Sequence, residues 1–187
     1  MAFTSKAIIL LLFSSLAWWQ ASALDGSTEI VQGLKNITTM TKALTTEVNR
    51  ISKSNVGVYG RRVVDGIENI TKAFVRANSS LNTVSGRLSD RDEFPVLGAF
   101  IKVSQAHRNL TRSLVAEKTF IILITNGYAE SIESALFRLR EVVVTKTESY
   151  GPHLLRFLIR GEYLRIFLRK LDESLSFALF RFAQLGG

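Results

Sequence analysis

Few residues in this chain of 187 could catalyse a reaction or bind a metal. The chain has no cysteine and only two histidines, His107 and His153, and neither has a carboxylate at metal-ligand spacing. The sequence also lacks a Gly-x-Ser-x-Gly elbow, a phosphate-binding glycine loop and a dinucleotide fingerprint. His107 falls on an apolar helical stripe, which is typical of a core residue whose hydrogen bonds are satisfied. His153 follows Pro152, where a capping or surface role is expected. We therefore predict no catalytic residue, no metal site and no cofactor.

Asp90, Asp92 and Glu93 form an acidic cluster just before Pro95. Pro95 is expected in the first turn of a helix, where its missing N–H costs nothing. Carboxylates at that place complement the positive end of the helix dipole. We prefer this interpretation to a calcium site.

The first 23 residues have the pattern of a secretory signal peptide. Lys6 supplies a positive charge, residues 7–19 form an apolar run, and Ala21-Ser22-Ala23 is a small-residue cleavage site. The run is too short to span a bilayer comfortably, and no second long apolar stretch follows it. We predict a signal peptide at residues 1–23 and one secreted domain at residues 24–187, located outside the cell or in the cell wall.

The predicted mature chain is basic and has no disulfide. Without Lys6 it has 23 basic and 16 acidic residues, a net charge of +7. This excess favours acidic partners such as cell-wall polysaccharides, anionic lipid surfaces or fatty-acid carboxylates. Nucleic acid is a poor candidate, because the chain is predicted to be secreted and has no concentrated basic tract.

Hydrophobic residues recur at helical spacing along the whole predicted mature chain. The spacing predicts helices over residues 30–51, 63–88, 96–121, 132–143 and 154–182, and Ser27 or Thr28 can cap the first. Breaks are expected at residues 55–60 and at Asn126-Gly127, and the third helix is expected to bend or end near Lys118. The last helix is expected to run unbroken after Gly151-Pro152. The fold class is therefore all-α: an antiparallel bundle of about five helices without disulfides.

Four N-glycosylation sequons begin at Asn36, Asn69, Asn78 and Asn109. Asn36, Asn69 and Asn109 each stand one residue before a core position, so their side chains should face outward. Asn78 lies at the edge of its apolar stripe. Glycans would coat the first three helices and leave the last two bare.

The last predicted helix carries more apolar residues than one buried face can accommodate, which leaves three interpretations open. It is the central helix of a bundle, it lines a pocket for an apolar ligand, or it attaches to a membrane. The third interpretation depends on basic residues that interleave with the apolar ones. These are Arg156, Arg160, Arg165, Arg169 and Lys170.

The chain resembles the fungal family of hydrophobic surface binding proteins and cell-wall galactomannoproteins. The resemblance covers nearly all of the predicted mature chain. It rests on the signal peptide, the absence of cysteine and four spaced patterns: Ile30-Val31-x-x-Leu34, Thr45-Thr46-x-Val48-Asn49, Leu110-x-x-x-Leu114-x-x-x-Lys118-x-Phe120 and Ile132-x-x-x-Leu136-x-x-Leu139. The resemblance implies a secreted or wall-associated protein, and some members are implied to enclose fatty acids between helices.

We therefore expect a secreted, N-glycosylated protein, not an enzyme, that binds fatty acids or other lipids in a pocket between helices. A carboxylate would lie near the mouth of the bundle, where Arg or Lys can meet it. The alternatives are a cell-wall or hydrophobic-surface adhesion protein without a stoichiometric ligand, and a membrane-active secreted factor. The candidate pocket residues are Phe100, Val103, Leu136, Leu139, Leu164 and Phe167.

Overall fold

A computed structural model describes residues 5–82, 87–146 and 149–184, with side chains described from residue 26 onward. These residues form helices and no strand, which confirms the all-α fold class. In chain order the elements are α1 (Ser5–Val48), α2 (Val56–Leu81), α3 (Asp90–Val115), α4 (Glu117–Thr125), α5 (Ala129–Arg140), the π-helical turn η1 (Glu141–Thr145), α6 (Tyr150–Phe157) and α7 (Gly161–Ala183).

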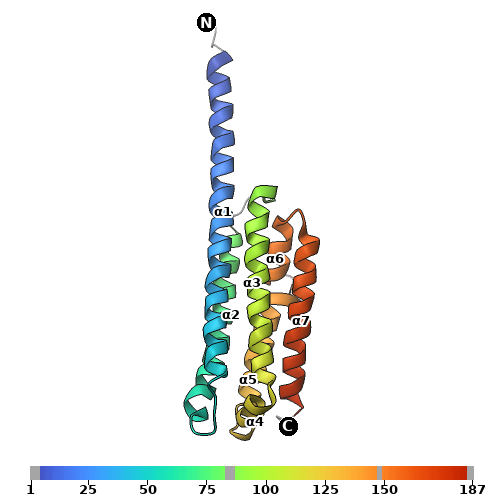
Figure 1. The fold of residues 1–187 in the computed structure, drawn as a ribbon. Coiled ribbons are helices and arrows are strands. Elements are labelled where there is room, and N and C mark those ends of the chain that lie inside the picture. The colour runs from blue at the N-terminus through green and yellow to red at the C-terminus, as the bar shows by residue number, and fades with distance from the viewer. Residues whose placement is uncertain (1–4, 83–86, 147–148, 185–187) are drawn as a thin grey trace.

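The longer helices form a closed ring. α1 packs against α2 and α3, α3 packs against α7, α7 packs against α5, and α5 returns to α2. The short helix α6 lies against α2, η1 and α7, and α4 follows α3 at one end of the bundle (Figure 1). The apolar stripe of each helix faces the interior of this ring, so a single buried core runs from Ile30 to Phe182.

The first half of α1 extends beyond the rest of the bundle as a lone helix (Figure 1). It contains residues 5–23 of the predicted signal peptide, and α1 continues without a break through Ser27 and Thr28, so neither residue caps a helix. Within the part of the chain that the structure describes, no helix combines the length and hydropathy needed to cross a membrane.

The break between the first two helices lies earlier than the sequence predicts. α2 begins at Val56, not after residue 60, because Asn55 closes the preceding turn. Its side-chain oxygen accepts a hydrogen bond from the Ser52 N–H at 2.8 Å, and its amide donates to the Arg50 carbonyl at 3.0 Å. Gly60 is buried inside α2, where an added Cβ would lie 2.4 to 2.6 Å from the Tyr128 ring. This glycine therefore serves close packing instead of a turn.

α3 begins five residues before Pro95, so the prediction that Pro95 lies in the first turn was wrong. Ser89 is the true cap. Its hydroxyl accepts a hydrogen bond from the Asp92 N–H at 3.3 Å and donates one to the Asp92 carboxylate at 2.5 Å. Asp90, Asp92 and Glu93 all lie in the first turn, as the dipole interpretation predicts.

The third predicted helix ends where Glu117 interrupts its stripe: Ala116 separates α3 from α4. Asn126-Gly127 forms the expected turn, with Gly127 at a φ of +79°. The fourth predicted helix is α5, which continues to residue 145 as the π-helical turn η1.

The last predicted helix is two helices, which corrects the prediction of an unbroken one. α6 ends at Phe157, Leu158 is extended, and α7 begins at Gly161. Leu88, just before α3, and Glu93, in the first turn of α3, stabilise this break. The Leu88 N–H donates to the Phe157 carbonyl at 2.8 Å, and the Arg160 N–H donates to a Glu93 carboxylate oxygen at 2.5 Å. The apolar period alone misses the break, because Leu154 and Leu164 on either side are both buried.

Candidate functional site

The predicted pocket residues lie on three helices that line one part of the ring. Phe100 and Val103 are on α3, and Leu136 and Leu139 are on α5. α7 packs against both helices and carries the remaining two, Leu164 and Phe167. The residues on α3 and α5, together with Leu164, are fully buried.

Phe167 is half-buried at the edge of the core, and the Lys170 ammonium lies 5.9 Å from its ring centroid. The Lys170 cation therefore makes a cation–π contact with Phe167 at the edge of the apolar core. The role of the six residues as walls of a lipid site stays a prediction.

Three rings from different elements meet in the core. Phe74 of α2 lies with its ring centroid 5.6 Å from that of His107 on α3 and 5.4 Å from that of Tyr150 on α6. All three side chains are fully buried. The imidazole and the phenol therefore enter a part of the core that contains the apolar ring of Phe74.

His107 is a buried histidine, as its apolar stripe predicts, but only one of its nitrogens has a partner. Nδ1 lies 3.0 Å from the Val103 carbonyl oxygen. Because that oxygen can only accept, Nδ1 carries the proton and Nε2 is left as an acceptor. Nε2 has no hydrogen-bond partner. Burial lowers the pKa of His107 to about 4, so the imidazole is neutral at pH 7.

Tyr150 was missed by sequence reasoning. Its side chain is fully buried at the first position of α6, and its hydroxyl has no hydrogen-bond partner. Burial raises the pKa of the phenol well above its ordinary value, so it stays a neutral donor. The sequence feature that could have identified Tyr150 is its position as an aromatic residue directly before Gly151-Pro152. The sequence analysis treated that pair only as a helix boundary.

Glu93 lies in the first turn of α3 with Asp90 and Asp92, as predicted, and its side chain is also buried inside the protein, 1% exposed. One carboxylate oxygen accepts the Arg160 N–H, and the other has no hydrogen-bond partner. Its burial follows from the position of the α6–α7 break directly against the first turn of α3. Within the described residues, no group of three or more acidic or histidine side chains is placed to hold a metal.

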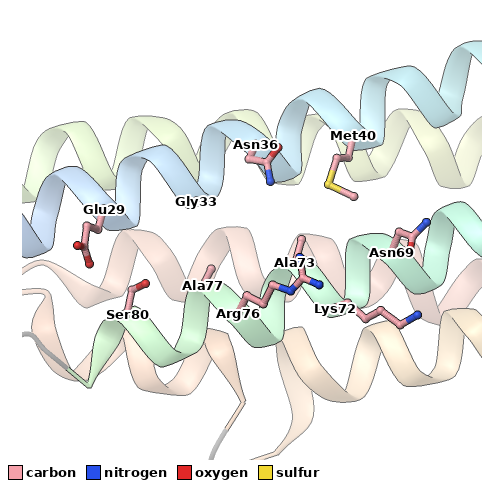
Figure 2. A pocket seen from close by; sticks show the side chains of 10 residues that line it. All are labelled: Glu29, Gly33, Asn36, Met40, Asn69, Lys72, Ala73, Arg76, Ala77 and Ser80. Atoms are coloured by element: carbon pink, nitrogen blue, oxygen red, sulfur yellow. The ribbon is translucent and has the colours of Figure 1, made fainter.

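A groove of about 410 Å³ lies on the outside of the ring, between α1 and α2 (Figure 2). Its rim is polar, and none of the six predicted pocket residues lines it. Gly33 and Ala77 close its floor, because a Cβ added at Gly33 would lie 3.2 Å from the Ala77 Cβ. Asn36 and Asn69, two of the predicted glycosylation sites, line it from facing helices (Figure 2).

The sequon asparagines lie largely as predicted. Asn36, Asn69 and Asn109 are exposed, and Asn78 is half-buried. Glycans on Asn36 and Asn69 would cover the outer groove.

The outer face of α7 exposes large apolar side chains. Tyr163, Ile166, Phe177 and Phe180 are 44 to 58% exposed and lie on one face of the helix. Lys170 lies on the same face.

No protein-family model matches the sequence, and no curated protein matches it. Solved structures with a similar fold include two fatty-acid complexes. One is the crystal structure of AFMP4P in complex with palmitic acid, with 17% sequence identity and a TM-score of 0.71, covering 83% of this chain and 99% of that chain.

The other is ligand-binding domain 1 of the Penicillium marneffei MP1 protein, complexed with arachidonic acids. It has 12% sequence identity and a TM-score of 0.73, and the match covers 84% of this chain and 98% of that one. At these identities the two structures establish the fold of this chain: it is the all-α fold of proteins that were solved with fatty acids bound.

Proposed function

We propose that this protein binds a fatty acid or a related single-chain lipid in the interior of the helical ring. The observation that carries the proposal is that two proteins of the same fold, matched over almost their whole length, were solved with fatty acids bound. The apolar interior of the ring supports it, because each buried methylene contributes about 0.8 kcal/mol to binding. We infer a carrier or sequestering role, with no chemical step.

The proposed binding site lies between α3, α5 and α7. Phe100, Leu139 and Leu164 represent its three walls, and all are fully buried. An acyl chain needs room there, so the ring must widen when the ligand enters. The interruptions at Ala116 and Leu158 and the π-helical turn η1 are the places where the helices can shift without breaking long hydrogen-bonded runs.

Secretion and glycosylation are part of the proposal. We infer that the signal peptide is removed before Leu24 and that glycans occupy Asn36, Asn69 and Asn109. The resemblance in sequence patterns and the shared fold together support a relationship to fungal cell-wall mannoproteins, with wall polysaccharide as a further partner.

The experiment is native mass spectrometry of the secreted protein after enzymatic deglycosylation. The expected result is a mass that starts at Leu24, together with an adduct of one fatty-acid mass that organic extraction removes. A protein that carries no lipid and takes up none when palmitic acid is added would contradict the proposal. Adsorption to an apolar surface without a stoichiometric ligand would then favour the adhesion alternative.

A second candidate function is attachment to anionic membranes through α7. The exposed face with Phe177 and Phe180 favours it, because aromatic side chains beside Lys170 suit a lipid interface. Co-sedimentation with phosphatidylglycerol vesicles tests it, with phosphatidylcholine vesicles as the control. The double variant Phe177→Ser, Phe180→Ser should lose vesicle binding, and undiminished binding would exclude this face.

A further inference from the structure

We propose that His107 and Tyr150 form a buried anchor for a lipid head group that can both donate and accept a hydrogen bond, namely a protonated carboxylic acid or a lipid alcohol. This inference rests on the proposed function, because it concerns the head group of a ligand in the ring interior. It places that head group inside the ring and not at the mouth of the bundle.

The placement of the two side chains carries the inference. His107 comes from α3 and Tyr150 from α6, and both rings pack on the same residue, Phe74 of α2. Both side chains are fully buried. His107 Nε2 and the Tyr150 hydroxyl each lack a hydrogen-bond partner, and they do not bond to one another.

Buried polar atoms without partners are costly, so such atoms call for an explanation. A phenylalanine would fill either place with an apolar ring of similar size and no such cost. Two unpartnered polar atoms whose rings pack on one buried aromatic ring are what a site for a polar group on an apolar ligand requires.

The hydrogen-bonding capacity of the two groups selects the head group. Nδ1 of His107 donates to the Val103 carbonyl, so Nε2 can only accept. The phenol hydroxyl of Tyr150 supplies a donor. A protonated carboxyl group satisfies both, because its O–H donates to Nε2 and its carbonyl accepts from Tyr150.

A lipid alcohol has the same hydrogen-bonding capacity, because its hydroxyl can donate to Nε2 and accept from Tyr150. An ionised carboxylate has no donor for Nε2, so it fits the pair poorly. A methyl ester can accept from Tyr150 but has nothing to donate to His107. The anchor therefore predicts different affinities for ligands that have the same hydrocarbon chain but different head groups.

The experiment compares four probes of sixteen-carbon chain length: palmitic acid, hexadecanol, methyl palmitate and hexadecane. Their affinities are measured by calorimetry for the delipidated wild type, Tyr150→Phe and His107→Phe. Loss of one hydrogen bond is expected to weaken binding roughly five- to tenfold. Tyr150→Phe should weaken the acid, the alcohol and the ester, and His107→Phe should weaken the acid and the alcohol but leave the ester unchanged.

Hexadecane should bind all three proteins equally, since it makes no hydrogen bond. Tyr163→Phe is the matched control, because Tyr163 is exposed on the outer face of α7 and should leave all four affinities unchanged. If the wild type, Tyr150→Phe and His107→Phe bind each probe with the same affinity, the anchor is overturned. The proposed lipid site in the ring interior would still stand. A wild type that binds none of the probes would overturn the proposed function as well.

A second measurement uses the wild type alone. The nitrogen NMR resonance of unprotonated His107 Nε2 should shift when hexadecanol is added, because that nitrogen gains a donor. Hexadecane should not produce the hydrogen-bonding shift. Identical spectra with both probes, at concentrations where both bind, would contradict the anchor even if the substituted proteins fail to fold.

Discussion

The backbone N–H of Arg160 donates a hydrogen bond of 2.5 Å to the carboxylate of Glu93, which ties the break between α6 and α7 to the first turn of α3. The Arg160 guanidinium reinforces this contact, lying 4.9 Å from the Phe94 ring centroid and 3.5 Å from the Asp90 carboxylate. The bond to Glu93 satisfies a backbone donor at a helix start that has no side-chain cap. A buried acidic residue thus sets the path of the chain between the last two helices.

Glu93→Ala should lower the free energy of unfolding by roughly 1–3 kcal/mol, because it leaves the part-buried Arg160 N–H without its acceptor. Glu93→Gln keeps an acceptor oxygen and should retain most of the stability. Urea unfolding followed by circular dichroism measures both. Glu173→Ala is the control, since its exposed pair with Arg169, at 3.7 Å, should contribute less than about 1 kcal/mol. Equal losses for Glu93→Ala and Glu173→Ala would show that the Arg160 bond is unimportant.

Two glycines in the first turns of α2 should respond oppositely to alanine. Gly57 has open space around its Cβ position, so Gly57→Ala should stabilise the protein by about 0.4–1 kcal/mol. Gly60→Ala places a methyl group against the Tyr128 ring and should cost about 1–3 kcal/mol. Thermal unfolding of the two variants checks this. A gain in stability for both would mean that Tyr128 moves aside freely.

His107 should make the protein less stable in mild acid. Its folded pKa of about 4 lies below its ordinary value of 6.5, so the unfolded chain takes up a proton first as the pH falls. The free energy of unfolding should be unaffected by this group above pH 6.5. It should decrease between pH 6.5 and about 4, by at most about 3 kcal/mol, and change no further below that.

The comparison with His107→Phe isolates this effect. The variant lacks the titrating imidazole, so its stability relative to the wild type should rise as the pH falls from 6.5 to 4. His153→Gln keeps His107 and should follow the wild type. A constant difference between wild type and His107→Phe across this range would mean that the imidazole is not buried in a neutral form.

The helical spacing of apolar residues predicted most of the core, because the buried face of a helix can be identified from residues close together in the sequence. Leu81 and Leu171 were placed on core faces by that spacing, and both are fully buried. The break at Leu158 and the burial of Glu93 could not be predicted in this way. Both depend on contacts between residues far apart in the chain, such as the bond between Glu93 and Arg160, which are 67 positions apart. Similarly, the spacing predicts that His107 faces the core, but the partners of its two nitrogens depend on helices from elsewhere in the sequence.

The same core provides a test of the assigned faces. Leu81→Ala and Leu171→Ala should each cost about 2–5 kcal/mol, since both side chains are removed from a packed interior. Val75→Ala, at a position that is 54% exposed, should change the stability by less than about 0.5 kcal/mol. Chemical denaturation measures all three. Reducing agent should leave the midpoint unchanged, because the chain has no cysteine.

The affinity for fatty acids should increase with chain length until the ring interior is filled. Each added methylene is expected to contribute about 0.8 kcal/mol, so two carbons should strengthen binding roughly fifteenfold. Calorimetric titration of the delipidated protein with acids from eight to eighteen carbons measures the series. Leu139→Phe adds volume to one proposed wall, so it should shift the plateau to a shorter chain.

Phe167→Asp, at the half-buried edge of the core, should abolish binding while the helical circular dichroism signal persists. Phe137→Asp is the matched control, because Phe137 is 49% exposed on α5 and should leave the series unchanged. An affinity that does not vary with chain length would contradict enclosure of the acyl chain by the ring.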